Sequence, residues 1–157
     1  MTSPMNARQT RPALARKPPK RRPDCLGPEA VDCRRSPIHG RGLFARIDLP
    51  ARRKLGELTG RLVKLPQARR AIERLPVIYF VELNSRYALD CSDGNEFKHL
   101  NHSCEPNCFL RVFKKAVEVY TLRAIPVGTE LTVDYSLTPH KRGMGCLCGS
   151  SKCRGNI

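Results

Sequence analysis

The chain has 157 residues and a formal net charge of +15, and 40% of its residues are hydrophobic, but only 6% are aromatic and none is Trp. This length suffices for one domain with its own core and a tail. No apolar run approaches the roughly 18 residues of a membrane-spanning helix, and no hydrophobic segment follows the basic N-terminus. We therefore expect no membrane association and no secretion.

The first 28 residues form a basic, proline-rich segment. Residues 1–23 contain seven Lys and Arg, five Pro and no acid. Such a segment cannot bury enough apolar surface to offset its chain entropy, so we predict that residues 1–28 are a disordered tail. Two interpretations of this tail stay open. It either keeps the protein in solution or anchors it electrostatically to nucleic acid.

Most of the remaining chain reads as short strands between Gly, Pro and Asn turns. The only convincing helix covers residues 66–75, because Pro66 lies in its first turn, Pro76 follows its end, and Ala68, Ala71, Ile72 and Leu75 share a face. This pattern predicts a mostly β domain built from several small sheets. No βα repeat or Gly-rich dinucleotide turn is present, which argues against Rossmann-type cofactor binding. The expected strands are residues 30–34, from 43 onward, 55–65 (bent at Gly56 and Gly60), 77–83, 86–91, 108–113, 116–122 and 131–135, with a helical turn at 96–100.

Three cysteines near the C-terminus have a spacing typical of metal ligands. Cys146 and Cys148 are separated by one residue, and Cys153 follows shortly after. This spacing favours chelation over disulfide pairing, and with no export signal we expect a reducing compartment and a bound metal. Zinc prefers four thiolates in a tetrahedron, so these cysteines supply three of four ligands. Cys91 and Cys108 are expected to be small buried apolar side chains.

Three further motifs precede these cysteines. They are Ser-Pro-Ile-His-Gly-Arg-Gly-Leu-Phe-Ala at residues 36–45, Asn-His-Ser-Cys-Glu-Pro-Asn at 101–107, and Glu-Leu-Thr-Val-Asp-Tyr at 130–135. In this order, and with the cysteine tail, they resemble the SET-domain family of protein-lysine methyltransferases, which use S-adenosylmethionine. The resemblance covers about residues 31–157. It implies a SET fold of small β-sheets with a pseudoknot, in which residues 101–107 pass beneath residues 130–135.

The resemblance also implies a domain division and a set of ligand contacts. Residues 1–28 would be the tail, 29–136 the SET domain and 137–157 a post-SET zinc-binding segment. Cys104 would be the fourth zinc ligand, and zinc would hold the tail over the active site. Only Cys25 and Cys33 lie upstream, too few for the pre-SET cysteine module of some histone-specific relatives. The implied S-adenosylmethionine contacts are His39, Gly40, Arg41, Tyr79, Asn101, His102 and Tyr135.

Tyr135 is the predicted catalytic residue. Methyl transfer from a sulfonium to an amine is an in-line displacement that needs a neutral amine aligned with the methyl group. A tyrosine hydroxyl where the cofactor and substrate pockets meet can orient that amine. Relatives often carry aromatic residues at the positions of Leu110 and Val133, where they limit the number of methyl groups. We therefore hypothesise that di- or trimethylation fits this pocket.

The leading prediction is a zinc-containing, S-adenosylmethionine-dependent protein-lysine N-methyltransferase acting on a protein that presents a lysine. One alternative is an inactive SET-fold binding module, tethered to nucleic acid by its tail. Another is a small zinc-bearing nucleic-acid-binding protein, which the charge alone would favour. The expected location is the cytoplasm, with nucleoid or chromatin association, or the nucleus in a eukaryotic cell.

Overall fold

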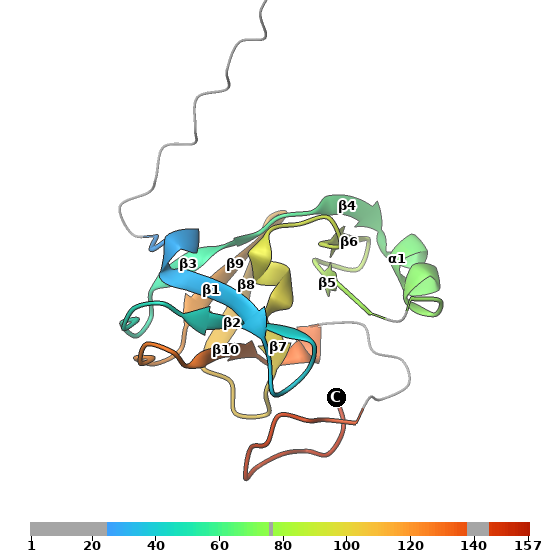
Figure 1. Ribbon diagram of the computed structural model, residues 1–157. Coiled ribbons are helices and arrows are strands. Elements are labelled where there is room, and N and C mark those ends of the chain that lie inside the picture. Colours follow the sequence, from blue (N-terminus) through green and yellow to red (C-terminus); the bar gives the residue numbers. More distant parts are fainter. Residues whose placement is uncertain (1–24, 76, 138–144) are drawn as a thin grey trace, which may run out of the picture.

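The computed structural model describes residues 25–75, 77–137 and 145–157, so the predictions for residues 1–24 lie outside the described residues. Its strands form three small sheets, with the orders β1-β2-β10-β7, β3-β9-β8 and β4-β6-β5 (Figure 1). The predicted mostly β architecture with one short α-helix is confirmed. The elements are β1 (Val31–Arg35), β2 (Arg41–Ala45), β3 (Lys54–Leu58), β4 (Arg61–Lys64), α1 (Leu65–Ile72), β5 (Phe80–Glu82), β6 (Tyr87–Asp90), β7 (Asn101–His102), β8 (Cys108–Phe113), β9 (Ala116–Thr121) and β10 (Glu130–Val133), with 3₁₀ helices η1 (Pro28–Ala30), η2 (Glu96–His99) and η3 (Tyr135–Leu137).

The first sheet brings two distant motifs side by side. β10 pairs antiparallel with β2 and parallel with the two-residue β7, with Thr132 opposite Asn101. The buried Asn107 fixes this arrangement, because its Nδ2 donates to the Glu130 carbonyl at 2.7 Å and its Oδ1 accepts the Thr132 N–H at 2.9 Å. The proximity expected from a pseudoknot is therefore present.

The main core lies between the first two sheets. β8 and β9 form the predicted hairpin, whose turn contains Lys114 with a φ of 56°. η2 places Phe97, which is 2% exposed, against this core. Burial of such large apolar side chains supplies most of the stability of a domain of this size. The large apolar side chains of this core include Leu43, Leu49, Leu55, Phe97, Leu100, Ile125 and Leu131.

Helix α1 packs on the third sheet and is shorter than predicted. Leu65, Ala68 and Ile72 are buried against β5 and β6. The predicted helix extended to residue 75, but Leu75 lies beyond the end of α1 and is 42% exposed. Pro76 disfavours helical geometry in Leu75, the residue before it, which is why the helix does not include residue 75.

Two predicted strands are also corrected. Residues 55–65 form two strands rather than one, β3 and β4, which belong to different sheets. The strand predicted at residues 131–135 ends at Val133, and Tyr135 begins η3. The chain turns there because the Tyr135 N–H donates to His102 Nδ1 at 3.1 Å and the Ser136 N–H donates to Asp134 Oδ1 at 3.1 Å. Tyr135 is thereby directed away from the strand ladder.

Residues 25–28, which we assigned to the tail, contact the domain. The Leu26 N–H donates to the Lys54 carbonyl at 3.0 Å, and the Gly27 N–H donates to the Leu55 carbonyl at 2.9 Å. These bonds extend the edge of β3, so the folded part includes Cys25. Within the described ranges, no helix has the length and apolarity needed to cross a lipid bilayer.

Candidate active site and metal centre

A cavity of about 390 Å³ lies where β2, β7, η3 and the C-terminal residues meet. Its volume is within the range of small-molecule sites in proteins. The structure brings together every residue that the sequence analysis named as a cofactor contact, although these residues come from four separate parts of the chain. Those residues are His39, Gly40, Arg41, Tyr79, Asn101, His102 and Tyr135.

Asn101 holds the glycine turn that forms one wall of this cavity. Its Nδ2 donates to the carbonyl oxygens of His39 and Arg41, both at 3.1 Å, and to Glu130 Oε1 at 2.8 Å. Gly40 has a φ of +49°, a left-handed conformation that favours glycine. The Asn101 amide therefore shapes the wall of the cavity, which the sequence analysis did not foresee.

The His102 ring connects Tyr135 to the cysteine cluster. The ring is 2% exposed, and its Nδ1 accepts the Tyr135 N–H at 3.1 Å. In the neutral ring the proton therefore resides on Nε2, which lies 3.3 Å from Cys104 Sγ and can donate to it. An imidazole N–H directed at a ligand sulfur is a common outer contact of metal sites. His102 thus positions both the backbone of Tyr135 and the sulfur of Cys104.

The Tyr135 side chain lines two cavities. Its hydroxyl donates to the Leu100 carbonyl at 2.8 Å. Burial raises the pKa of Tyr135 to about 12, with further increases from Tyr79 and Glu130, so the group is a neutral hydroxyl at physiological pH. The second cavity, of about 40 Å³, has a mostly apolar lining that also includes Lys98. Its lining includes Tyr79, Leu110, Val133 and Tyr135.

Two titratable residues of the larger cavity were missed by the sequence analysis. They are Lys98 and His99, the last two residues of η2, and their place one residue before the Asn-His motif is the signal that could have identified them. Burial and the cations Arg41 and Lys98 lower the pKa of His99, which favours its neutral form. Among the described residues, no Asp or Glu lines this cavity. Its electrostatics therefore suit a ligand with an anionic end.

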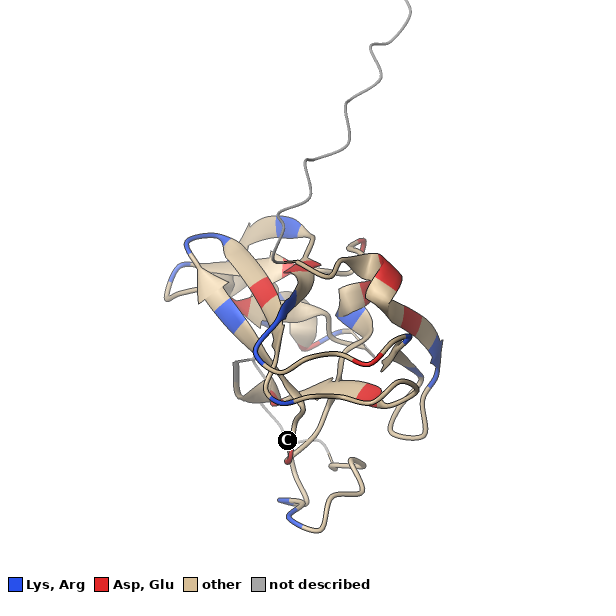
Figure 2. Cartoon of the chain, turned by 90° about the vertical axis from the view of Figure 1, so that its left-hand side faces the viewer, with Lys and Arg blue, Asp and Glu red and all other residues tan. Residues whose placement is uncertain are grey.

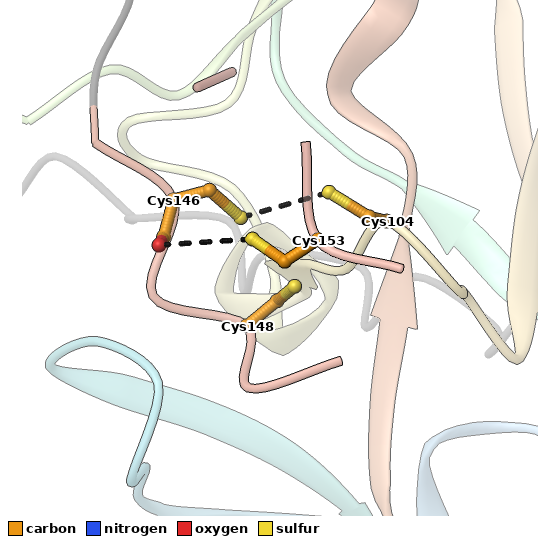
Figure 3. Close-up of side chains that lie close together, drawn as sticks. All are labelled: Cys104, Cys146, Cys148 and Cys153. Atoms are coloured by element: carbon orange, nitrogen blue, oxygen red, sulfur yellow. Dashed lines mark hydrogen bonds between the residues drawn. The ribbon is translucent and has the colours of Figure 1, made fainter. Parts of the chain in front are cut away.

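The four cysteines predicted to bind zinc form one cluster (Figure 3). All four Sγ atoms lie within 4.8 Å of one another, and those of Cys104 and Cys146 are 3.7 Å apart. A Zn–S bond of about 2.3 Å gives tetrahedral S···S edges of about 3.8 Å, so the cluster can close around the ion with small adjustments. The members are Cys104, Cys146, Cys148 and Cys153.

Backbone amides around the cluster favour thiolates over thiols. The Arg154 N–H donates to Cys104 Sγ at 3.3 Å. The backbone amides of Cys104 and Ser150 lower the pKa of the Cys148 thiol to about 6. Zinc binds thiolates, so this donor set matches the ion. Burial raises the pKa of Cys146 in the cluster to about 12, as it does for the core residues Cys91 and Cys108, so Cys148 is the cluster member whose pKa favours the thiolate.

Residues 145–157 cover one side of the larger cavity, to which Cys146, Leu147 and Ile157 contribute. Two acidic residues of the preceding domain hold this segment through pairs that sequence spacing could not indicate. Asp134 accepts both guanidinium bonds of Arg154, at 2.8 and 2.9 Å, and this contact lowers the pKa of the Asp134 carboxyl. Glu105 accepts from Ser150 Oγ at 2.5 Å and from Lys152 Nζ at 3.0 Å.

Comparison with known proteins agrees with this geometry. The family model described as SET domain matches residues 40–136. Histone-lysine N-methyltransferase trithorax of Drosophila virilis is 34% identical over 129 residues, which cover 76% of this chain and 3% of that protein. Human histone-lysine N-methyltransferase 2B is 35% identical over 137 residues, covering 80% of this chain and 5% of that protein. The chain spans less than a tenth of the length of these relatives. This chain belongs to the SET-domain family.

Proposed function

We propose that this protein is an S-adenosylmethionine-dependent protein-lysine N-methyltransferase. The observation that carries the proposal is the position of Tyr135, which lines both the large cavity and the small, mostly apolar one. In a transfer between two bound molecules, the reacting atoms must meet in line at one point. A shared wall with a hydroxyl group provides such a point.

The larger cavity would hold the methyl donor. S-adenosylmethionine supplies an electrophilic methyl group on a sulfonium, and it also carries an amino-acid carboxylate. Arg41 and Lys98 offer cations to that carboxylate, while the Gly40 turn offers backbone groups. Both features support a donor with a charged amino-acid end.

The small cavity would hold the lysine side chain. Its mostly apolar lining and the cation of Lys98 both disfavour an ammonium ion, so they lower the pKa of the bound amine. Because Tyr135 donates its proton to Leu100, its oxygen acts as an acceptor toward the amine and orients the nitrogen lone pair. That lone pair forms the new N–C bond, the C–S bond breaks with its electrons left on sulfur, and the nitrogen releases one proton to solvent.

The cysteine cluster would hold a structural zinc ion. Four protein thiolates complete a tetrahedron and leave no open position for a substrate. The ion would join Cys104 of the SET domain to Cys146, Cys148 and Cys153 of the last segment. It would thereby keep residues 145–157 against the cavity.

The substrate class and location follow from the relatives. Those matched here are named histone-lysine N-methyltransferases, so we propose a histone lysine as the acceptor and chromatin as the site of action. A protein with a charge of +15 is not attracted to a basic histone alone. The two would meet on DNA, to which residues 1–23 supply seven cations.

The test is to incubate the zinc-loaded protein and methyl-labelled S-adenosylmethionine with free core histones and with nucleosomes. We expect label on one or a few histone lysines, identified by mass spectrometry. Calorimetric binding of the donor without label on any protein would contradict the enzymatic proposal. That result would favour the alternative of an inactive binding module.

A further inference from the structure

A separate cavity of about 210 Å³ lies at the end of the β3-β9-β8 sheet where Cys25 joins the chain to β3. It shares no lining residue with either cavity at Tyr135. Four cationic side chains line it against one carboxylate, that of Glu118. The four cations are Arg52, Arg53, Lys54 and Arg111.

Two of these cations are already paired. Lys54, only 9% exposed, donates to Glu118 Oε1 at 2.6 Å and also contacts Glu57. Arg111 Nε donates to Glu118 Oε2 at 2.7 Å. The hydrogen bond from Lys54 lowers the pKa of the Glu118 carboxyl, so it stays ionised. Lys54 and Arg111 are therefore neutralised by Glu118 in the lining and by Glu57 outside it.

Arg52 and Arg53 carry the remaining positive charge. Within residues 25–75, 77–137 and 145–157, neither guanidinium has a hydrogen-bond or ion-pair partner. Their backbone is nevertheless fixed, because Thr121 accepts the Arg52 N–H on its carbonyl at 3.0 Å and the Arg53 N–H on its hydroxyl at 2.9 Å. Two adjacent arginines with a fixed backbone thus line a cavity with excess positive charge.

We propose that this cavity binds backbone phosphates of a nucleic acid. Guanidinium groups match phosphate oxygens in fork geometry, and the cavity has room for a phosphate-sized group. The floor also presents Tyr120, which stacks on Phe109 with 5.4 Å between ring centroids and has the Arg111 guanidinium 4.9 Å above its ring. Figure 2 shows that Lys and Arg, in blue, lie on several loops of the domain.

The adjoining chain favours a nucleic acid over a short acidic peptide. Cys25 lines the cavity, and the 24 residues that precede it include seven cations and one acid, Asp24. A long polyanion with evenly spaced charges can contact both the cavity and these residues, which raises its affinity through release of counterions. Because the cavity at Tyr135 is separate, a nucleic acid bound here would leave that cavity open.

The test uses the full-length chain with Arg52→Gln and Arg53→Gln combined, and a labelled DNA duplex titrated over a range of salt concentrations. Each lost phosphate contact reduces the slope of log affinity against log salt by about 0.9, so we expect a reduction of about two. The matched control is Arg70→Gln with Arg74→Gln, which removes the same charge from the exposed region around α1. We expect this control and Tyr135→Phe to bind DNA as the wild type does.

Equal slopes for the wild type and the Arg52/Arg53 variant would overturn the proposal. So would binding of poly-glutamate as tight as that of DNA and equally dependent on Arg52 and Arg53, since that result would assign the cavity to acidic proteins. Thermal unfolding of both double variants checks that the fold is retained.

Discussion

β10 and the C-terminal residues 145–157 both contribute to the surroundings of Tyr135, yet they are held in different ways. β10 lies between β2 and β7, and its Leu131 and Val133 are at most 2% exposed. No residue among 145–157 is fully buried, and this segment is held by thiol clustering, the Arg154 pair and contacts to Glu105. Apolar burial maintains one wall of the site and polar contacts maintain the other. The second wall can therefore be lost without unfolding of the first.

Zinc removal tests this difference with the largest expected effect. Chelation should release residues 145–157 and reduce methyl transfer below about 1% of the zinc-loaded rate, because ligand binding and order are coupled in such segments. Hydrogen exchange should accelerate in residues 145–157 while β2 and β10 stay protected. Full turnover after verified zinc loss would contradict the role given to this segment.

A matched pair of cysteine variants separates metal binding from core stability. Cys148→Ala should lose zinc and activity with little change in the unfolding of the sheets, because Cys148 belongs to the cluster. Cys108→Ala should keep zinc but unfold at a lower temperature, because Cys108 is fully buried in the core. Zinc content by elemental analysis and thermal unfolding measure the two effects. Zinc retention by Cys148→Ala would disprove its role as a ligand.

The small cavity is predicted to control product rather than rate. Leu110 lines it as an aliphatic side chain, so we expect the wild type to form di- or trimethyllysine. Leu110→Tyr should fill this space with an aromatic ring and stop the reaction at monomethyllysine. Leu110→Met places an unbranched, non-aromatic side chain there and should still form the higher methylated products. Mass spectrometry of a substrate peptide reads the product directly. Only monomethyl product from the wild type after long incubation would exclude this interpretation.

The Arg154–Asp134 pair should have a smaller effect. Both side chains are partly exposed, so solvent screening limits what the pair contributes. We expect Arg154→Ala to weaken donor binding about two- to fivefold, with the zinc retained and the difference reduced at high salt. Arg154→Lys keeps the charge but loses one of the two hydrogen bonds to Asp134. Its donor affinity should therefore lie between those of the wild type and Arg154→Ala. No change in donor affinity for Arg154→Ala would show that zinc alone positions the segment.

The Lys152–Glu105 contact is expected to matter least. The Lys152 side chain is 79% exposed, and exposed ion pairs contribute little to stability. Lys152→Ala should change donor affinity by less than about twofold, measured by the same calorimetry. A loss as large as that of Arg154→Ala would reverse the ranking of the two contacts.

Sequence alone identified the parts of the site that lie in short, continuous motifs. The Asn-His motif, the segment ending in Tyr135 and the C-terminal cysteines each indicated their position, and the structure brings these residues together. Contacts between distant residues could not be inferred in this way. The Asn101 bonds to the turn around Gly40 and the Arg154–Asp134 pair depend on how the chain folds back. Likewise, β10 ends before Tyr135 because His102, far away in sequence, accepts its N–H.

The central claim is that the Tyr135 hydroxyl, at the junction of two cavities, enables the transfer without being needed to bind the donor. The most direct test compares Tyr135→Phe with wild type, and with Tyr87→Phe as a control from β6, by calorimetric titration of S-adenosylmethionine and by label transfer to histones. We predict similar donor affinities for all three proteins and a transfer rate lowered by about 100-fold or more in Tyr135→Phe alone. Transfer by Tyr135→Phe at the wild-type rate would contradict the account.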